Sequence, residues 1–131
     1  MKYKFRGKNI DTGEWVYGGH VVAEGRSFIY PEDVSIFIDE RFIFPEEYIS
    51  GFVEVIPETV GQFTGEFDEK KVKIFEGDIV RGKDGFGDIA TAEVKYMGGS
   101  YYPLGEGEFY WTNIHVIGNV HDNPELIKEQ K

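Results

Sequence analysis

Cysteine is absent from this chain of 131 residues, and leucine and alanine together number only five. Without cysteine the chain can form no disulfide, no thiolate metal site and no cysteine nucleophile. The sequence also has no apolar run of about 18 residues, so it predicts no membrane-spanning helix. The first residues contain no apolar stretch of the kind found in secretory signals, so we expect no signal peptide.

Basic residues are scarce as well. The chain has 14 Lys and Arg against 24 Asp and Glu, which gives a net charge of −10. Nucleic-acid binders usually present a basic face, because neutralising phosphates supplies most of their affinity. Nucleic acid is therefore an unexpected partner. The most acidic stretch, residues 31–58, contains a single base, Arg41. It is interpreted either as a solubilising surface or as an acidic face that docks on a basic partner or mimics nucleic acid.

The apolar residues that are present are mostly β-branched or aromatic. They comprise 13 Ile, 12 Val, 11 Phe, 8 Tyr and 2 Trp. Such residues fit a pleated, half-buried surface. Short apolar stretches recur at intervals of roughly eight to twelve residues and are separated by glycine-rich turns, a spacing typical of small barrels and sandwiches. The longest predicted strand covers residues 89–97, and residues 34–44 are ambiguous. The sequence therefore predicts a mainly β fold.

Two closely packed parts are predicted. Residues 1–56 form a β-rich N-terminal part, and residues 57–131 form a C-terminal part that ends in a short helix. The boundary is placed at Pro57 because a strand stops there. Asp122 or Asn123 can cap the final helix, and Pro124 is suited to its first turn. A helix this short must dock on the rest of the protein to be stable.

Known chemical motifs are matched only superficially. Residues 77–83 have the spacing of a phosphate-binding loop, but Asp84 stands where a Ser or Thr should reach magnesium, and the intervening residues predict a strand. The three histidines, His20, His115 and His121, match no zinc spacing. No serine lies in a Gly-x-Ser-x-Gly sequence. We therefore predict no catalytic, cofactor-binding or metal-binding residues.

Paired carboxylates leave one enzymatic alternative open. General acid–base catalysis would need one member of a pair to be buried with a raised pKa. The pairs are Glu32/Asp33, Asp39/Glu40, Glu46/Glu47 and Asp68/Glu69.

Aromatic residues gather in the C-terminal half and are the most suggestive feature. They are Phe86, Tyr96, Tyr101, Tyr102, Phe109, Tyr110 and Trp111. Most could fill a core that is poor in leucine. In a strand, however, one member of each adjacent pair must point outward, which predicts some exposed aromatic surface. Such a surface suits a protein contact or the stacking of nucleic-acid bases.

Several sequence segments carry a family resemblance. Residues 59–65 (TVGQFTG), 74–80 (IFEGDIV) and 116–126 (VIGNVHDNPEL) resemble the YopX family of prophage proteins. The opening Phe5-Arg6-Gly7 and the later residues 15–17 also fit this family. The resemblance implies a β-rich phage or prophage protein in the bacterial cytoplasm, with a C-terminal domain of SH3-like barrel type. It implies no reaction and no catalytic residues.

We therefore expect a non-enzymatic accessory protein that needs no cofactor and acts through protein–protein contacts. Self-association is expected, and a phage or host protein is a further candidate partner. The predicted contact residues are Tyr101, Tyr102, Tyr110 and Trp111. Two alternatives remain: a small barrel that binds single-stranded nucleic acid, and a small carboxylate-dependent hydrolase.

Overall fold

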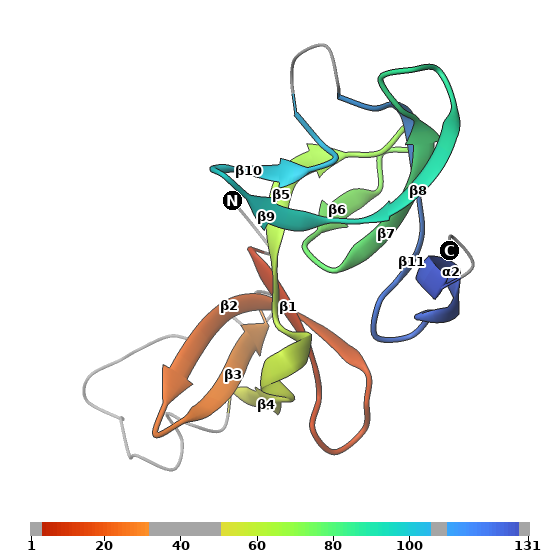
Figure 1. The fold of residues 1–131 in the computed structure, drawn as a ribbon. Coiled ribbons are helices and arrows are strands. Elements are labelled where there is room, and N and C mark those ends of the chain that lie inside the picture. Colours follow the sequence, from red (N-terminus) through yellow and green to blue (C-terminus); the bar gives the residue numbers. More distant parts are fainter. Residues whose placement is uncertain (1–3, 32–50, 106–109, 129–131) are drawn as a thin grey trace. The chain divides into compact units, whose positions relative to one another are not determined.

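The computed structural model describes residues 4–31, 51–105 and 110–128. These residues contain eleven strands, one 3-10 turn and one short α-helix, so the predicted mainly β fold is confirmed (Figure 1). The ambiguous residues 34–44 and most of the acidic stretch lie outside the described residues. Among those that are described, no helix combines the length and apolar character needed to cross a membrane.

The chain divides into two compact units, Met1–Gln62 and Phe63–Lys131. The 3-10 turn η2 (Pro57–Thr59) belongs to the first unit, because the Lys8 N–H donates to the Thr59 hydroxyl over 2.9 Å. The division after residue 56, into parts that each form a domain, stays a prediction.

The first unit is an antiparallel sheet with the strand order β4-β3-β2-β1. The beginning of β5 pairs with β1 through Phe5–Gln62 and Arg6–Gly61. The strands are β1 (Phe5–Lys8), β2 (Trp15–Ala23), β3 (Arg26–Pro31), β4 (Val53–Val55) and β5 (Gly61–Phe67). Ile29 and Val55 are fully buried in this unit.

Gly18 and Gly19 are explained by close packing. The sequence suggests a bulge or bend at these residues, but β2 continues through them, with Gly18 opposite Pro31 and Gly19 opposite Tyr30. A Cβ on Gly18 would lie 2.0 Å from the carbonyl oxygen of Tyr30, and a Cβ on Gly19 would overlap the Tyr30 ring. Glycine is needed here because backbone and ring approach the strand closely.

The second unit is built from several small antiparallel sheets, with β11-β7-β8 as the largest and β10-β9 as a hairpin. Phe63 of β5 pairs with Phe75 of β6. The strands are β6 (Lys73–Phe75), β7 (Asp78–Lys83), β8 (Ile89–Glu93), β9 (Lys95–Met97), β10 (Ser100–Tyr102) and β11 (Thr112–Asn119). No sheet closes on itself within the described residues, so the SH3-like barrel is not confirmed.

Val94 divides the long strand that was predicted over residues 89–97. Its N–H donates to the Asp78 carbonyl over 2.8 Å, its carbonyl accepts the Gly77 N–H, and its side chain is fully buried. It joins Ile74, Val80 and Leu104 in the core, with Tyr101, Ile114 and Val116 packed around them. Val94 is thus a buried residue between two shorter strands, β8 and β9.

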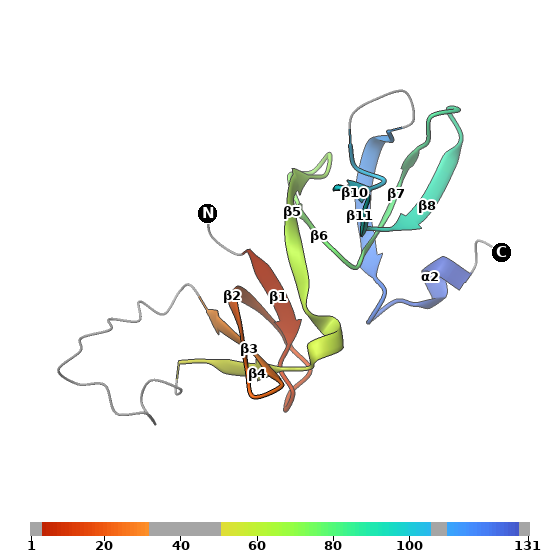
Figure 2. The same ribbon diagram turned by 60° about the vertical axis from the view of Figure 1, so that its left-hand side comes forward.

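The predicted C-terminal helix is present as α2 (Glu125–Lys128), which contacts β8 (Figure 2). The turn before it is held by side-chain amides. Asn119 Oδ1 accepts the N–H groups of His121 and Asp122, and Asn123 Oδ1 accepts the Asn119 N–H over 3.2 Å. The Asn123 side chain therefore turns back to the end of β11.

Candidate functional site

The predicted aromatic pairs each expose one member. Tyr102 and Tyr110 are each 47% exposed, whereas Trp111 is only 7% exposed. Tyr101 is half-buried and packs against the core. The prediction of some exposed aromatic surface is confirmed. A role for these residues in protein contact stays a prediction.

Ring contacts link the two pairs. The rings of Tyr102 and Trp111 lie 6.1 Å apart between centroids, in an edge-to-face arrangement. Tyr101 faces Tyr96 across the β9–β10 hairpin, with centroids 5.2 Å apart. Burial raises the pKa of the Tyr101 hydroxyl, and the nearby Glu76 charge raises it further. We call Tyr101, Tyr102, Tyr110 and Trp111 the aromatic surface.

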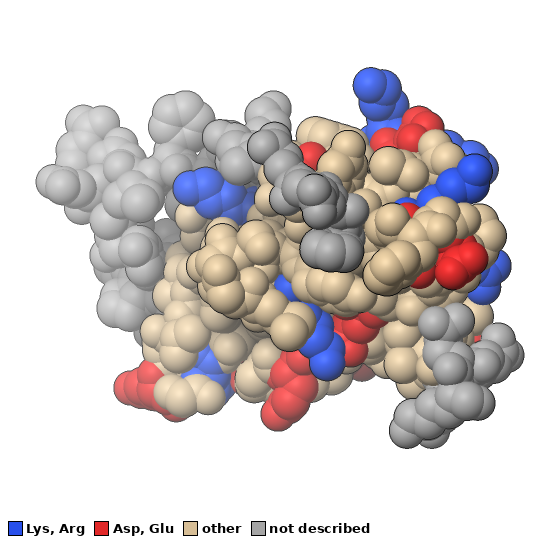
Figure 3. All heavy atoms as spheres, turned by 45° about the horizontal axis from the view of Figure 1, so that its top comes forward, with Lys and Arg blue, Asp and Glu red and all other residues tan. Residues whose placement is uncertain are grey.

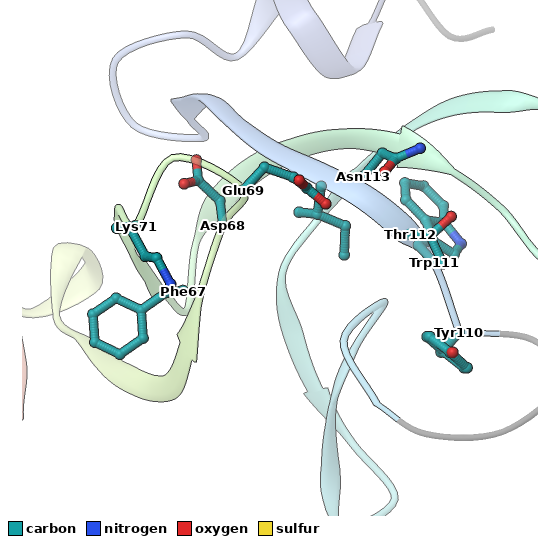
Figure 4. A pocket seen from close by; sticks show the side chains of 9 residues that line it. Phe67, Asp68, Glu69, Lys71, Tyr110, Trp111, Thr112 and Asn113 are labelled. Atoms are coloured by element: carbon teal, nitrogen blue, oxygen red, sulfur yellow. The ribbon is translucent and has the colours of Figure 1, made fainter.

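An open hollow of about 420 Å³ lies beside this surface in the second unit (Figure 4). One wall is the turn between β5 and β6, which contributes residues 67–69 and 71. The other wall is residues 110–114, which include two members of the aromatic surface. We call this feature the aromatic hollow. Phe67, which is 51% exposed, adds a ring from the first wall.

Asp68 links the first wall to strand β11, which carries most of the second wall. Its Oδ1 accepts the N–H groups of Lys70 and Val72 over 2.8 and 2.9 Å, and its Oδ2 accepts the Val116 N–H over 3.0 Å. Burial acts to raise the pKa of this carboxyl, but the three N–H donors and the nearby His115 outweigh it, so the pKa is lowered. Asp68 is thus an ionised structural residue.

Two residues of the hollow have unusual backbone angles. Lys71 has a φ of 68° and Asn113 a φ of 54°, in the left-handed region that non-glycine residues rarely adopt. The ladder between β11 and β7 shifts register between Thr112 and His115, which places Asn113 in a bulge. Bulges often occur beside functional sites, where they redirect a side chain. Sequence analysis missed this bulge, although the tolerance of Asn for positive φ was a weak signal.

The described carboxylate pair is poorly suited to acid–base catalysis. Asp68 has a lowered pKa, whereas a general acid needs a raised one. The other three pairs and Phe109 lie outside the described residues. The described part of the chain holds no cluster of three His, Asp or Glu that could bind a metal ion. Residues 78–83 are strand β7, as predicted, so no phosphate-binding loop forms there.

Charged side chains show no obvious polyanion-binding face in the view of Figure 3. Lys and Arg lie there in separate groups, interspersed with Asp, Glu and other residues. A continuous basic surface is the usual electrostatic signature of nucleic-acid binding.

Comparison with protein families identifies the family of this chain. The family model described as YopX protein matches residues 4–128. No curated protein matches the chain.

Proposed function

We propose that this chain, which belongs to the YopX family, is a non-enzymatic phage or prophage accessory protein. It acts through protein–protein contacts. The proposal includes self-association and a setting in the cytoplasm of a bacterial host. One observation carries it: Tyr102 and Tyr110, each 47% exposed, lie around the buried Trp111 in a well-packed unit.

Aromatic side chains of this kind favour interfaces for a physical reason. Tyrosine and tryptophan are enriched at interface cores, and a few such residues supply most of the binding energy. Trp111 is held edge-on by Tyr102 and is therefore already ordered before a partner arrives. When a partner covers Tyr102 and Trp111, these two rings would lose little additional side-chain entropy.

Single-stranded nucleic acid remains the second candidate ligand. Exposed rings can stack bases, and Phe67 and Tyr110 line the same hollow as Lys71. The net charge of −10 opposes this candidate. A carboxylate-dependent hydrolase has less support, because Asp68 is ionised and engaged by three N–H groups.

Light scattering over a concentration series tests the proposal. We expect a mass above the 15.0 kDa of one chain at high concentration, and a return to that mass in the double variant Tyr102→Ala, Tyr110→Ala. Loss of these rings should weaken association by about tenfold or more. Tyr17→Ala is the matched control, because Tyr17 is 38% exposed and belongs to the first unit.

Affinity capture from lysogenic cells complements this measurement. The proposal predicts a protein that wild type and Tyr17→Ala retain and that the double variant loses. A monomeric mass at every concentration would refute self-association. Equal capture by wild type and the double variant would refute the contact role of the tyrosines. A mobility shift of labelled single strands at low salt would support the nucleic-acid alternative instead.

A further inference from the structure

We propose that the aromatic hollow binds an arginine or lysine side chain from an extended basic segment of a different protein, with Glu69 as its counter-charge. This inference rests on the proposed function and specifies the chemistry of the partner. It starts from the only exposed carboxylate side chain among the described residues that line the hollow.

Glu69 is well placed for this role. Figure 4 shows its side chain extending from the β5–β6 turn toward the wall of residues 111–113, while Lys71 lies beside Phe67. The backbone of Glu69 is anchored, because its N–H donates to the Ile114 carbonyl over 3.0 Å. Its carboxylate has no ion-pair partner in the described part of the chain and can accept a hydrogen bond from an incoming cation.

Exposed rings in the same hollow as a carboxylate favour a cation as the ligand. Tyr110 and Phe67 are 47% and 51% exposed and line the hollow from opposite walls. A guanidinium or ammonium group over a ring gains about 0.5–2 kcal/mol, and a guanidinium also forms charge-assisted hydrogen bonds with a carboxylate. The chain already uses such contacts, since Arg6 lies 4.5 Å from the Trp15 ring centroid and Lys73 lies 5.5 Å from that of Phe63.

The surrounding charge selects the partner. The second unit has 8 Lys and Arg against 13 Asp and Glu, a net charge of −5 over residues 63–131. Asp68 adds a permanent negative charge at the edge of the hollow. A basic segment is steered toward such a surface more strongly than a second copy of this chain, which carries the same charge of −10. We therefore assign the hollow to a different protein.

Fluorescence anisotropy at low salt tests the inference with a defined probe. The probe is a fluorescein-labelled peptide of three Gly-Ser-Arg repeats, and its control has citrulline, an uncharged analogue of the same shape, at each arginine. We expect the arginine peptide to bind at least tenfold more tightly than the citrulline peptide. Glu69→Gln should weaken its binding by about tenfold. Glu66→Gln, an exposed carboxylate of β5 outside the hollow, should change it by less than about twofold.

The variant Lys71→Gln tests whether the hollow binds a cation or an anion. It removes a positive charge from the hollow, so it should tighten binding of the arginine peptide. If Lys71→Gln instead weakens binding of a thymidine oligonucleotide while Glu69→Gln strengthens it, the hollow takes an anion and the inference is wrong. An equal loss in Glu66→Gln and Glu69→Gln would also overturn it, because only general charge would then be at work. Thermal unfolding of each variant checks that the fold is intact.

The outcomes separate this inference from the proposed function. If Tyr110→Ala abolishes protein capture but Glu69→Gln leaves peptide binding unchanged, the contact function stands and the cation site fails. If the peptide binds in a Glu69-dependent manner but the tyrosine variants capture partners as wild type does, the cation site stands and the contact role of the tyrosines fails.

Discussion

The two units hold their strands together by different means. In the first unit, strand β2 depends on close packing at two glycines, where the Tyr30 carbonyl approaches Gly18 and the Tyr30 ring lies over Gly19. In the second unit, the buried carboxylates of Asp68 and Asp78 accept backbone N–H groups at turns. We therefore expect added side-chain volume to lower the stability of the first unit most. Loss of a buried negative charge should lower the stability of the second unit most.

Gly18→Ala should have the largest effect. The added Cβ would lie 2.0 Å from the Tyr30 carbonyl oxygen, and a backbone atom cannot move aside as a flexible side chain can. We expect the free energy of unfolding of the first unit to fall by about 3 kcal/mol. Urea unfolding, with amide hydrogen exchange in β2 and β3 as the local readout, measures the loss.

Gly13→Ala is the matched control in the same unit. Gly13 has a φ of 75°, but no atom lies within 4 Å of an added Cβ. The substitution should therefore cost only the strain of the backbone angle, about 1 kcal/mol. If the two variants lose equal stability, close packing does not explain the glycine at position 18.

Asp68→Asn should have the next largest effect, and in the other unit. An amide NH₂ cannot accept hydrogen bonds, so at least one of the N–H groups of Lys70, Val72 and Val116 would lose its acceptor. We expect a loss of about 2–3 kcal/mol at pH 7. Glu66→Gln, exposed on the preceding strand, should be nearly neutral.

The pH dependence of Asp68 provides a second check. Its pKa in the folded state lies below the ordinary value of 3.8, so its stabilising effect is present above that pH and is lost as the pH falls through the lowered pKa. Wild type should therefore lose stability more steeply than Asp68→Asn below pH 3.8. Parallel acid denaturation curves would contradict the role of Asp68 as an ionised link.

The sequence predicts local features better than distant pairings. Abundant Ile, Val and aromatic residues predict a β fold, and the pair Tyr101-Tyr102 predicts one exposed ring, because strand alternation is a local property. Tyr110 is exposed beside the buried Trp111 although neither residue belongs to a strand. The sequence does not predict that the strand is interrupted at Val94. The backbone of this residue bonds to Asp78 and Gly77, which lie far from it in sequence.

The link between Asp68 and strand β11 is not predicted, for the same reason. The sequence marks Asp68 only as a member of a carboxylate pair, but its hydrogen-bond partner Val116 is 48 residues away in sequence. No local pattern shows that one carboxylate will join a turn to a distant strand. The glycines at 18 and 19 were likewise assigned to a bend, because sequence does not show that Tyr30 packs over them.

His20 tests whether charge also affects the stability of the first unit. Its Nε2 is buried without a hydrogen-bond partner in the described structure, and burial lowers its pKa below 6.5. The folded state therefore resists the proton that the unfolded state takes up, and stability should fall as the pH drops below 6.5. His20→Phe should reduce this slope and change stability at pH 7 by less than about 1 kcal/mol.

The histidine variant has an internal control. It retains His115 and His121. Any change of stability with pH that remains below pH 7 therefore comes from groups other than His20. Hydrogen exchange should locate the lost slope in β2, where His20 packs beside the ring of Phe5 at 5.4 Å between centroids. An unchanged slope would show that the buried imidazole does not couple to folding.

Lys71→Gly should have the smallest effect, and it should be stabilising. The lysine has a φ of 68°, a conformation that glycine adopts freely, so relief of strain should outweigh the greater entropy of glycine in the unfolded chain. We expect a gain of about 0.5–1 kcal/mol in the free energy of unfolding of the second unit. Lys70→Gly is the control. Lys70 has no positive φ, so glycine there should destabilise by about the same amount. A loss of stability in both variants would show that the Lys71 side chain contributes more through its contacts than its backbone costs in strain.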